Sequence, residues 1–534
     1  MHPKSITNLL KLSVITLILV YLVCGLSECI NLSTADLGRH ITNGKLIVEA
    51  LRSGTDLKTQ TPLYLNFYSY TEPNYPTINH HWLTGVIHYL TYTDSGFSGL
   101  SILNITAIII GIGFFFLSAR TIAGTELALF SLILTLPILI WRNEVRPESF
   151  SYMLMGFEFY VLTLFRANKL SFTWTIILVT LSQLLWINCH IFFSIGIFIT
   201  GAYYLDSIIS SGTVFKHTTT RRYCYILSSV LLASLINPSG LTGLLEPLKI
   251  FHHYAYELLE NQSVWFMHKR FPSQILYYYF DILVLINVVV WIIRYHKSIL
   301  SFKEFVKSEF AFLLISFILV ILAMKTNRAI PVFVLSMIPI LAYNLSLITQ
   351  KFKIKNQSQN RIWAYYALLI VYMILLFNLT NVKLDNYKNL GLNPVINRSA
   401  EFFKAMNIQG PIFNNYDIGA YLIFHLFPQR RVFVDNRPEA YSTKFFNDIY
   451  KPMQASEGKW HEIDSRMNFN VIYFMRHDMT EHAQPFLIRR IADPNWAPVY
   501  VDNWNIILLK RNRTNQSIIK KYELPQEMFR SVKS

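Results

Sequence analysis

Eleven apolar segments fill most of the first 380 residues, and few folds can accommodate them. A helix needs about 20 predominantly apolar residues to cross a bilayer, so each segment predicts a transmembrane helix. The charge content agrees, since 15% of the chain is charged and soluble domains carry about 25%. The segments lie near 10–30, 101–118, 126–141, 149–165, 171–189, 191–210, 223–237, 276–293, 309–324, 329–348 and 362–379. We therefore predict a polytopic α-helical membrane protein.

The distribution of lysine and arginine predicts how these helices are oriented. Basic residues concentrate in alternate connecting segments, and such segments stay in the cytoplasm. This pattern places the N-terminus in the cytoplasm, and the odd number of helices then places the 31–97 loop and the C-terminal region outside. The same pattern accounts for the net charge of +16. Since no basic stretch resembles a nucleic-acid-binding motif, we expect membrane lipids and no nucleic acid as partners.

The C-terminal region has a different pattern, with short apolar runs separated by polar turns. "GPIFNNYDIGAYLIFHL" predicts a strand, a turn and a helix, and "YSTKFFNDIYKPM" predicts a helix. "RRVFVD", "NVIYFM" and "NWNIILLKR" predict strands. About 150 residues are enough to bury a core. We therefore predict a transmembrane domain over 1–379, including the 31–97 outer loop, and an extracytoplasmic α/β domain over 380–534.

Asp36 lies just beyond the first apolar segment. An amphipathic helix is predicted from Asp36 to about Leu51, with Arg39 on its water-facing side. In a structural interpretation, Ser33 or Thr34 caps this helix and Asp36 stabilises its first turn. In a functional interpretation, Asp36 faces a cavity at the membrane surface and acts as a base or a metal ligand. Both interpretations stay open at this stage.

The 31–97 loop contains further titratable residues: Glu72, His80 and His81. Neighbouring side chains on a helix point about 100° apart, so the two histidines cannot easily face one ion. Interfacial placement is the alternative, because aromatic and polar residues are common beside a bilayer. We predict His80 and His81 as substrate-binding candidates. Asp36, Glu72 or His80 are the candidate ligands if a divalent cation is bound, which the sequence leaves undecided.

Two other predicted outer loops are rich in arginine. "WRNEVRPESF" contains Arg142, Glu144, Arg146 and Glu148, and "KTNRAIP" contains Arg328. The planar fork of arginine suits phosphate recognition. Interfacial anchoring with internal ion pairs is the structural alternative.

Two more polar motifs have both a functional and a structural interpretation. "WINCH" places Asn188 and His190 at or near membrane depth, where polar groups are costly and often functional. "VFVDNRPEAY" places Asp435 and Arg437 at the end of a predicted strand, where ligands often bind. A turn fixed by an Asp–Arg pair explains the second motif equally well.

Taken together, several motifs resemble those of the GT-C superfamily of membrane glycosyltransferases, in a less-characterised, bacterial-type branch. They are "DLGRHITNGKLI", "NHHWL", "VRPESFSY", "WINCHIFFSIG", "NPSGLTGLLEP" and "YDIGAYLIFHLFPQRRVFVDNRPEAY", spread over residues 36–441. The resemblance implies a polytopic fold and transfer of a sugar from a polyprenyl-phosphate-linked donor. The implied acceptor is an extracytoplasmic lipid, glycan or protein of the cell envelope.

The resemblance also implies roles for individual residues. Asp36 matches the catalytic or metal-binding carboxylate of the first outer loop, and Arg146 and Arg328 are the candidates for binding the lipid phosphate. Glu144, His80, His81 and His190 complete the predicted substrate-binding set. The sequence departs from the family pattern in two ways, because His81 replaces a common glutamate and no Asp-x-Asp surrounds Asp36. Both departures put metal dependence in doubt.

Two other functional classes are compatible with many helices. A transporter or lipid flippase often shows an internal repeat and interrupted helices, and we find no repeated half in this sequence. A non-catalytic membrane scaffold would use the C-terminal region to bind partners. The long outer loop and the C-terminal outer domain favour a transferase.

Overall fold

The structure is a computed structural model that describes residues 3–34, 36–249, 255–349 and 359–529. The chain forms two compact units, which we call the helical unit and the mixed unit. The helical unit comprises Met1–Glu28, Ser101–Lys249 and Glu257–Leu390. The mixed unit comprises Cys29–Leu100, Ile250–Tyr256 and Gly391–Ser534.

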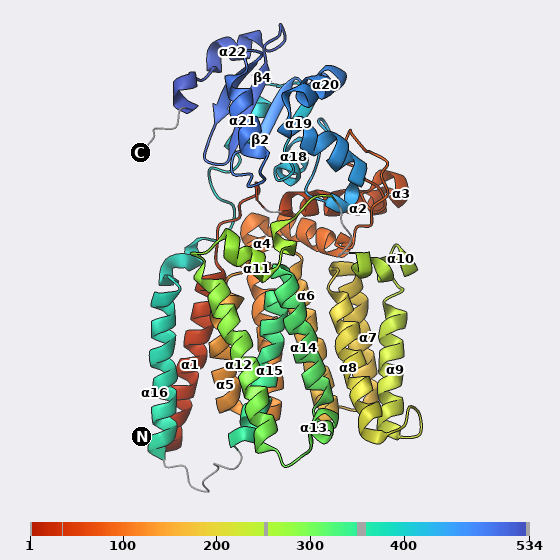
Figure 1. The fold of residues 1–534 in the computed structure, drawn as a ribbon, viewed down its shortest axis with the longest axis vertical. Coiled ribbons are helices and arrows are strands. Elements are labelled where there is room, and N and C mark those ends of the chain that lie inside the picture. Colours follow the sequence, from red (N-terminus) through yellow and green to blue (C-terminus); the bar gives the residue numbers. More distant parts are fainter. Residues whose placement is uncertain (1–2, 35, 250–254, 350–358, 530–534) are drawn as a thin grey trace. The chain divides into compact units, whose positions relative to one another are not determined.

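Every apolar segment predicted from the sequence coincides with a helix in the described residues (Figure 1). Helix α4 continues from the mixed unit into the helical unit and has a non-helical residue, Gly96, inside it. The eleven helices are α1 (Pro3–Leu26), α4 (Trp82–Ala123), α5 (Thr125–Leu139), α6 (Glu148–Arg166), α7 (Phe172–Cys189), α8 (Phe193–Ser211), α9 (Thr218–Ala233), α12 (Ile275–Lys297), α14 (Phe310–Lys325), α15 (Ile330–Thr349) and α16 (Gln359–Leu379). The predicted α-helical fold class of this part of the chain is therefore confirmed.

Seven helices in the described part of the chain are long and apolar enough to cross a membrane. The pair α13 (Phe302–Ser308) and α14, bent by 87°, would make an eighth span, and α5 is a shorter apolar helix. Crossing by all eleven helices stays a prediction.

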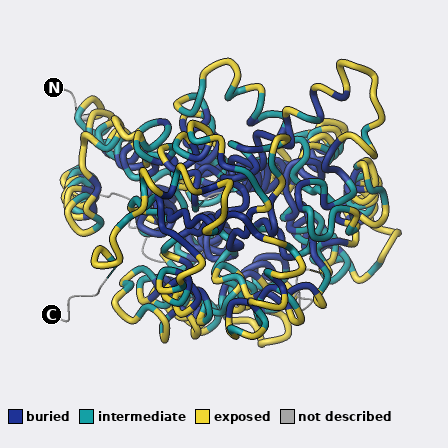
Figure 2. Tube along the Cα trace, turned by 90° about the horizontal axis from the view of Figure 1, so that it is seen from above, coloured by how far each residue is buried: buried dark blue, intermediate teal, exposed yellow. Residues whose placement is uncertain are grey.

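The helical unit has one continuous apolar core, to which helices from α1 to α16 contribute. Among the membrane-spanning candidates, α15 is the most buried and α16 the least. Leu368 and Leu379 on α16 are largely exposed. Large exposed apolar side chains along such helices are expected where lipid replaces water. Figure 2 shows how buried and exposed residues alternate along the chain.

The mixed unit contains a four-stranded sheet in the order β1-β2-β4-β3. Its strands are β1 (Ile412–Asn414), β2 (Val471–Met475), β3 (Trp496–Val501) and β4 (Asn505–Lys510). β1 and β2 are parallel, and the other two pairs are antiparallel. Helix α18 (Gly419–Leu426) follows β1, as predicted. An aromatic core includes Trp460, whose ring centroid lies 5.4 Å from that of Phe413 and 4.9 Å from that of Phe486.

The predicted strand "RRVFVD" is wrong, because Val432 forms only an isolated parallel bridge with Ser69. The side chain of Asn414, in β1, bonds to the backbone of this segment where a neighbouring strand would otherwise pair with it. Its Oδ1 accepts from Phe433 N at 2.9 Å, and its Nδ2 donates to Val434 O at 2.7 Å. These bonds satisfy backbone groups that a neighbouring strand would otherwise pair.

Residues 29–100 belong to the same compact unit as residues 391–534, whereas the sequence suggested a single division near residue 380. Ile30 forms a parallel bridge with Leu392. Helix α2 (Leu37–Ser53) packs on α18 at Gly38, where an added Cβ would lie 2.8 Å from Phe424 Cβ. An added Cβ at Gly44 would lie 1.9 Å from the carbonyl oxygen of Gly85 in α4. Glycine therefore permits both close helix contacts.

Candidate active site

A cavity of about 240 Å³ in the helical unit is lined by Arg142 and Arg146 of one predicted outer loop, and Arg328 of the other loop pairs with the lining residue Glu260. We call this cavity the arginine cavity. Arg142 and Arg146 come from the connection between α5 and α6, and Arg328 comes from the 3₁₀ turn η3 (Asn327–Ala329). The lining residues are Glu28, Asn104, Ile108, Trp141, Arg142, Asn143, Glu144, Arg146, Glu148, Ser149, Tyr152, Glu260, Asn327, Ile330 and Pro331.

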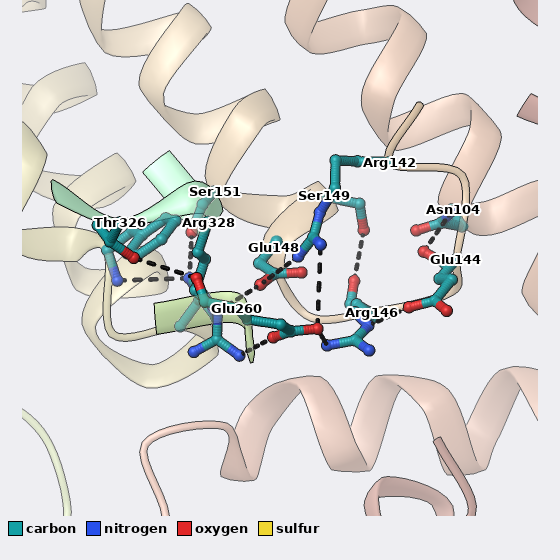
Figure 3. A network of polar contacts seen from close by, with 12 residues as sticks. Asn104, Arg142, Glu144, Arg146, Glu148, Ser149, Ser151, Glu260, Thr326 and Arg328 are labelled. Carbon is teal, nitrogen blue, oxygen red and sulfur yellow. Dashed lines mark hydrogen bonds and ion pairs between the residues drawn. The ribbon is translucent and has the colours of Figure 1, made fainter. Parts of the chain in front are cut away.

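Glu260 is the centre of an ion-pair network that joins all three arginines (Figure 3). Its Oε1 lies 2.5 Å from Arg146 Nη1 and 3.9 Å from Arg142 Nη1. Its Oε2 lies 2.5 Å from Arg328 Nη2. The guanidinium groups therefore converge on one carboxylate.

Glu148 is a second, more deeply buried carboxylate that pairs with two of these arginines, Arg142 and Arg328. It lies in the first turn of α6, where the helix dipole favours an acid. Its Oε1 is 3.3 Å from Arg142 Nη2 and 3.2 Å from Arg328 Nε. Glu144, which is more exposed, lies 2.6 Å from Arg146 Nε. Three carboxylates thus face three guanidinium groups, and the network is balanced in charge.

The turn that carries Glu260, η2 (Leu259–Asn261), is tied to η3 through the backbone. Thr326 Oγ1 donates to the carbonyl oxygen of Glu260 at 3.2 Å. Asn327 N donates to the carbonyl oxygen of Gln262 at 2.9 Å. Burial opposes ionisation of Glu260, but the positive charges of Arg146, Arg328 and Arg142 outweigh it and hold its pKa well below the usual value.

Arg146 and Glu144 of the predicted set line the arginine cavity. Arg328 is not among the lining residues, but it joins them through its ion pair with Glu260, which does line the cavity. Glu260 was missed because no motif in the sequence marks it. His190 is not among the residues that line the cavity. Its Nδ1 lies 2.8 Å from Ser151 Oγ, which accepts from Trp186 Nε1 at 2.8 Å. His190 therefore joins α6 and α7 within the buried helix packing.

Asp36 lies in the mixed unit, in a group of polar side chains that we call the Asp36 cluster: Asp36, Arg39, Asn436, Asp435 and Arg437. Asp36 accepts a hydrogen bond from Asn436 Nδ2, and its Oδ2 lies 3.3 Å from Arg39 Nη2. Arg39 Nε also donates to Asn436 Oδ1 at 3.4 Å. The Asp36 side chain keeps 28% of its surface exposed, so the carboxylate is held in place and still reachable.

Two predictions about α2 are wrong. Arg39, expected to face water, is 5% exposed because the start of α2 packs on α18 and the guanidinium pairs with Asp36. Neither Ser33 nor Thr34 caps the helix, since the N-cap residue is Asp36 and it makes no side-chain capping bond. The carboxylate of Asp36 is therefore directed to side chains and not to the helix backbone.

Asp435 and Arg437 form a buried, two-pronged ion pair in the same cluster. Arg437 Nε and Nη2 donate to the two carboxylate oxygens of Asp435 at 2.8 and 2.7 Å. Arg437 also donates to Asn66 Oδ1 at 3.0 Å and lies over the Tyr68 ring. This arrangement is the turn fixed by an Asp–Arg pair that the sequence left as one alternative.

Asp417 is an acidic residue between β1 and α18 that no motif in the sequence marks. Burial raises its pKa to about 8, and the carboxylates of Asp478 and Asp36 add to the effect. The folded protein therefore binds a proton here that the unfolded chain releases near pH 3.8.

We expect the folded state to become less stable as the pH rises, because Asp417 loses this proton. The contribution of Asp417 is fully present below pH 3.8 and is lost progressively up to about pH 8. Asp417→Asn should flatten that decline and raise the melting temperature at pH 8 relative to the native chain. The melting temperatures of the native chain and the variant are measured by thermal unfolding between pH 5 and 9. An unchanged slope in the variant would contradict the assignment.

Comparison with solved structures shows similarity over nearly the whole chain, although no family model and no curated protein matches it. The Archaeoglobus fulgidus oligosaccharyltransferase, solved with a tethered acceptor peptide, gives a TM-score of 0.57 at 11% identity, over 94% of this chain and 74% of that one. ArnT from Cupriavidus metallidurans, bound to undecaprenyl phosphate, gives a TM-score of 0.56 at 10% identity, over 97% of this chain and 99% of that one. Both are GT-C glycosyltransferases.

The chain has the GT-C fold. With its apolar helices, this fold makes it an integral, multi-pass membrane protein. The sequence-based resemblance to the GT-C superfamily is thereby confirmed at the level of the fold.

A GT-C oligosaccharyltransferase has also been solved with zinc and sulfate, at a TM-score of 0.50 and 11% identity. The predicted ligands of this chain do not fit a metal ion in their present arrangement. Asp36 pairs with Arg39, and Glu72 accepts from Ser442 N and Oγ, both at 2.7 Å. His80 lies beside His81, with ring centroids 6.0 Å apart. Within the described ranges, no three His, Cys, Asp or Glu side chains are grouped to hold a metal.

Proposed function

We propose that this protein is a glycosyltransferase that moves a sugar from a polyprenyl-phosphate-linked donor to an acceptor hydroxyl or amide outside the cytoplasm. The observation that carries the proposal is the convergence of three guanidinium groups on Glu260, a residue that lines the arginine cavity. The likeness to solved proteins supports it, since ArnT was solved with undecaprenyl phosphate and the archaeal enzyme AglB with dolichol-phosphate.

In this proposal the arginine cavity binds the phosphate of the donor. Charge-assisted, two-pronged hydrogen bonds from arginine are stronger and more directional than those of neutral donors. They stabilise the negative charge that develops on the phosphate as the bond between it and the sugar breaks. Arg146 and Arg328 are the two principal donors, because each makes a close contact with the present carboxylate.

Asp36 is the proposed general base. An acceptor group loses its proton to the Asp36 carboxylate while its oxygen or nitrogen forms a bond to the anomeric carbon of the sugar. The bond from that carbon to the phosphate oxygen breaks, and the lipid phosphate departs with the electron pair. Arg39 and Asn436 hold the Asp36 carboxylate in orientation. No metal ion enters this scheme.

Transfer of a radiolabelled sugar tests the proposal. Purified protein in lipid nanodiscs is incubated with polyprenyl-phosphate sugars and with lipid, glycan or peptide acceptors, and labelled acceptor is counted. Transfer dependent on the protein supports an enzyme. Donor binding without transfer to any acceptor, together with movement of the lipid across the bilayer, would favour the flippase alternative.

The proposal also includes an orientation, with the N-terminus in the cytoplasm and the 31–97 loop and C-terminal domain outside. Ser53 and Ser456 are both exposed. In a chain lacking native cysteines, Ser53→Cys and Ser456→Cys should both react with a membrane-impermeant thiol reagent in intact cells. Exposed Thr218, in a predicted inner loop, provides the control, since Thr218→Cys should react only after lysis. Labelling of only one outer position would overturn the predicted topology.

A further inference from the structure

The arginine cavity has no surplus positive charge. The guanidinium groups of Arg142 and Arg146 in its lining, and that of Arg328, which pairs with lining carboxylates, are matched by Glu144, Glu148 and Glu260. Glu28 adds a further acidic group to the lining. Bringing a phosphate into such a buried, balanced cluster leaves excess negative charge away from water, which costs free energy. A phosphate therefore needs one of the carboxylates to leave.

Glu260 is the carboxylate whose position resembles that of a bound anion. Its two oxygens are shared among three arginines, as the oxygens of a phosphate would be. Glu148 is 5% exposed and lies in the first turn of α6, and the Glu144 carboxylate forms an ion pair with Arg146. The Glu260 side chain, by contrast, keeps 23% of its surface exposed.

The backbone around Glu260 does not have to move for the side chain to leave. The carbonyl oxygen of Glu260 is held by Thr326, and Gln262 is held by Asn327. Rotation about the side-chain torsions alone removes the carboxylate from the guanidinium groups and keeps these bonds.

We propose that Glu260 is an internal, displaceable ligand that occupies the phosphate-binding position of the arginine cavity until a phosphate group takes its place. The inference rests on the proposed function, because it assumes that this cavity binds the donor phosphate. Glu260 has two effects in this scheme. It neutralises the three arginines in the unliganded protein, and it makes binding depend on a group that can contact all three.

The test compares phosphate binding by the native chain, Glu260→Gln and Glu144→Gln in nanodiscs. Glutamine keeps the size of the side chain but removes its charge. Glu260→Gln should bind polyprenyl phosphate about ten-fold or more tightly than the native chain. Without ligand it should melt at a lower temperature, because three arginines lose their shared partner. Glu144→Gln is the matched control, since it removes the same charge from one arginine only, and its gain should be clearly smaller.

Inorganic phosphate is the second probe, and Glu260→Asp the second variant. A gain with both probes assigns the position to the phosphate group itself, and a gain with the lipid alone assigns it to the lipid headgroup. Glu260→Asp keeps the charge but shortens the side chain, so its affinity should lie between those of the native chain and Glu260→Gln. If the native chain binds polyprenyl phosphate and Glu260→Gln binds no better, the displaceable ligand is disproved. If the native chain binds neither probe, the proposed function itself is contradicted, because the cavity then binds no phosphate.

Discussion

Asp36→Asn should abolish most sugar transfer and leave the protein folded. Loss of a general base typically costs about 10²–10⁴-fold in rate. Asparagine keeps an oxygen that can accept from Asn436, so the contact made by Asp36 survives the change. The ion pair with Arg39 is lost, which predicts a modest fall in melting temperature. The measurement is transfer rate per folded molecule, with the folded fraction taken from thermal unfolding.

The control for this prediction is Asp94→Asn, because Asp94 is an exposed aspartate in the part of α4 that belongs to the mixed unit. It should transfer at the native rate. Near-normal transfer by a well-folded Asp36→Asn variant would remove Asp36 from the reaction. A large loss of folded protein with normal specific activity would assign it a structural role through Arg39 and Asn436.

Arg146→Ala and Arg328→Ala should each weaken binding of the lipid donor by about ten-fold or more. The loss of one charge-assisted hydrogen bond is worth roughly 1.5–3 kcal/mol. Lysine should restore binding only in part, since it carries the charge without the planar fork. Donor affinity is measured by titration of a polyprenyl-phosphate-linked sugar. Because each alanine also leaves Glu260 with fewer partners, melting temperatures must be compared without ligand.

Arg120→Ala is the matched control, because Arg120 is exposed near the end of α4 and does not line the arginine cavity. Its donor affinity should equal that of the native chain. Unchanged affinity in both Arg146→Ala and Arg328→Ala would leave these residues as structural ion-pair partners of Glu148 and Glu260. Loss in one variant and not in the other would place the phosphate next to that arginine alone.

Local pattern was sufficient to predict the helices and most elements of the C-terminal region. Long apolar segments specify helices whatever their neighbours are, and all eleven coincide with helices in the described residues. Arg146 and Arg328 were predicted because the planar fork of arginine suits phosphate and because the family resemblance implies such a role, and both form ion pairs with Glu260. Whether they bind phosphate stays a prediction.

Long-range pairing accounts for what the sequence did not reveal. Arg39 looks water-facing on an isolated helix, and it is buried only because α2 packs on a helix nearly 400 residues later. The contact between Asp36 and Asn436 likewise joins two segments with no local signal. Glu260 lies in a stretch without a charge pattern, so its contact with three arginines required the folded chain.

The composition of the mixed unit from two distant segments has a consequence for synthesis of the protein. Roughly 290 residues, 101–390, separate its two main parts, and nearly all of them belong to the other unit. At about 5–20 residues per second, the ribosome needs about 15–60 s to make them. During that time residues 29–100 wait without the chain that Ile30 and Ser69 will pair with. Assembly of this unit therefore cannot begin until chain beyond residue 390 has been made, and a fragment that begins at residue 391 lacks one of its two main parts.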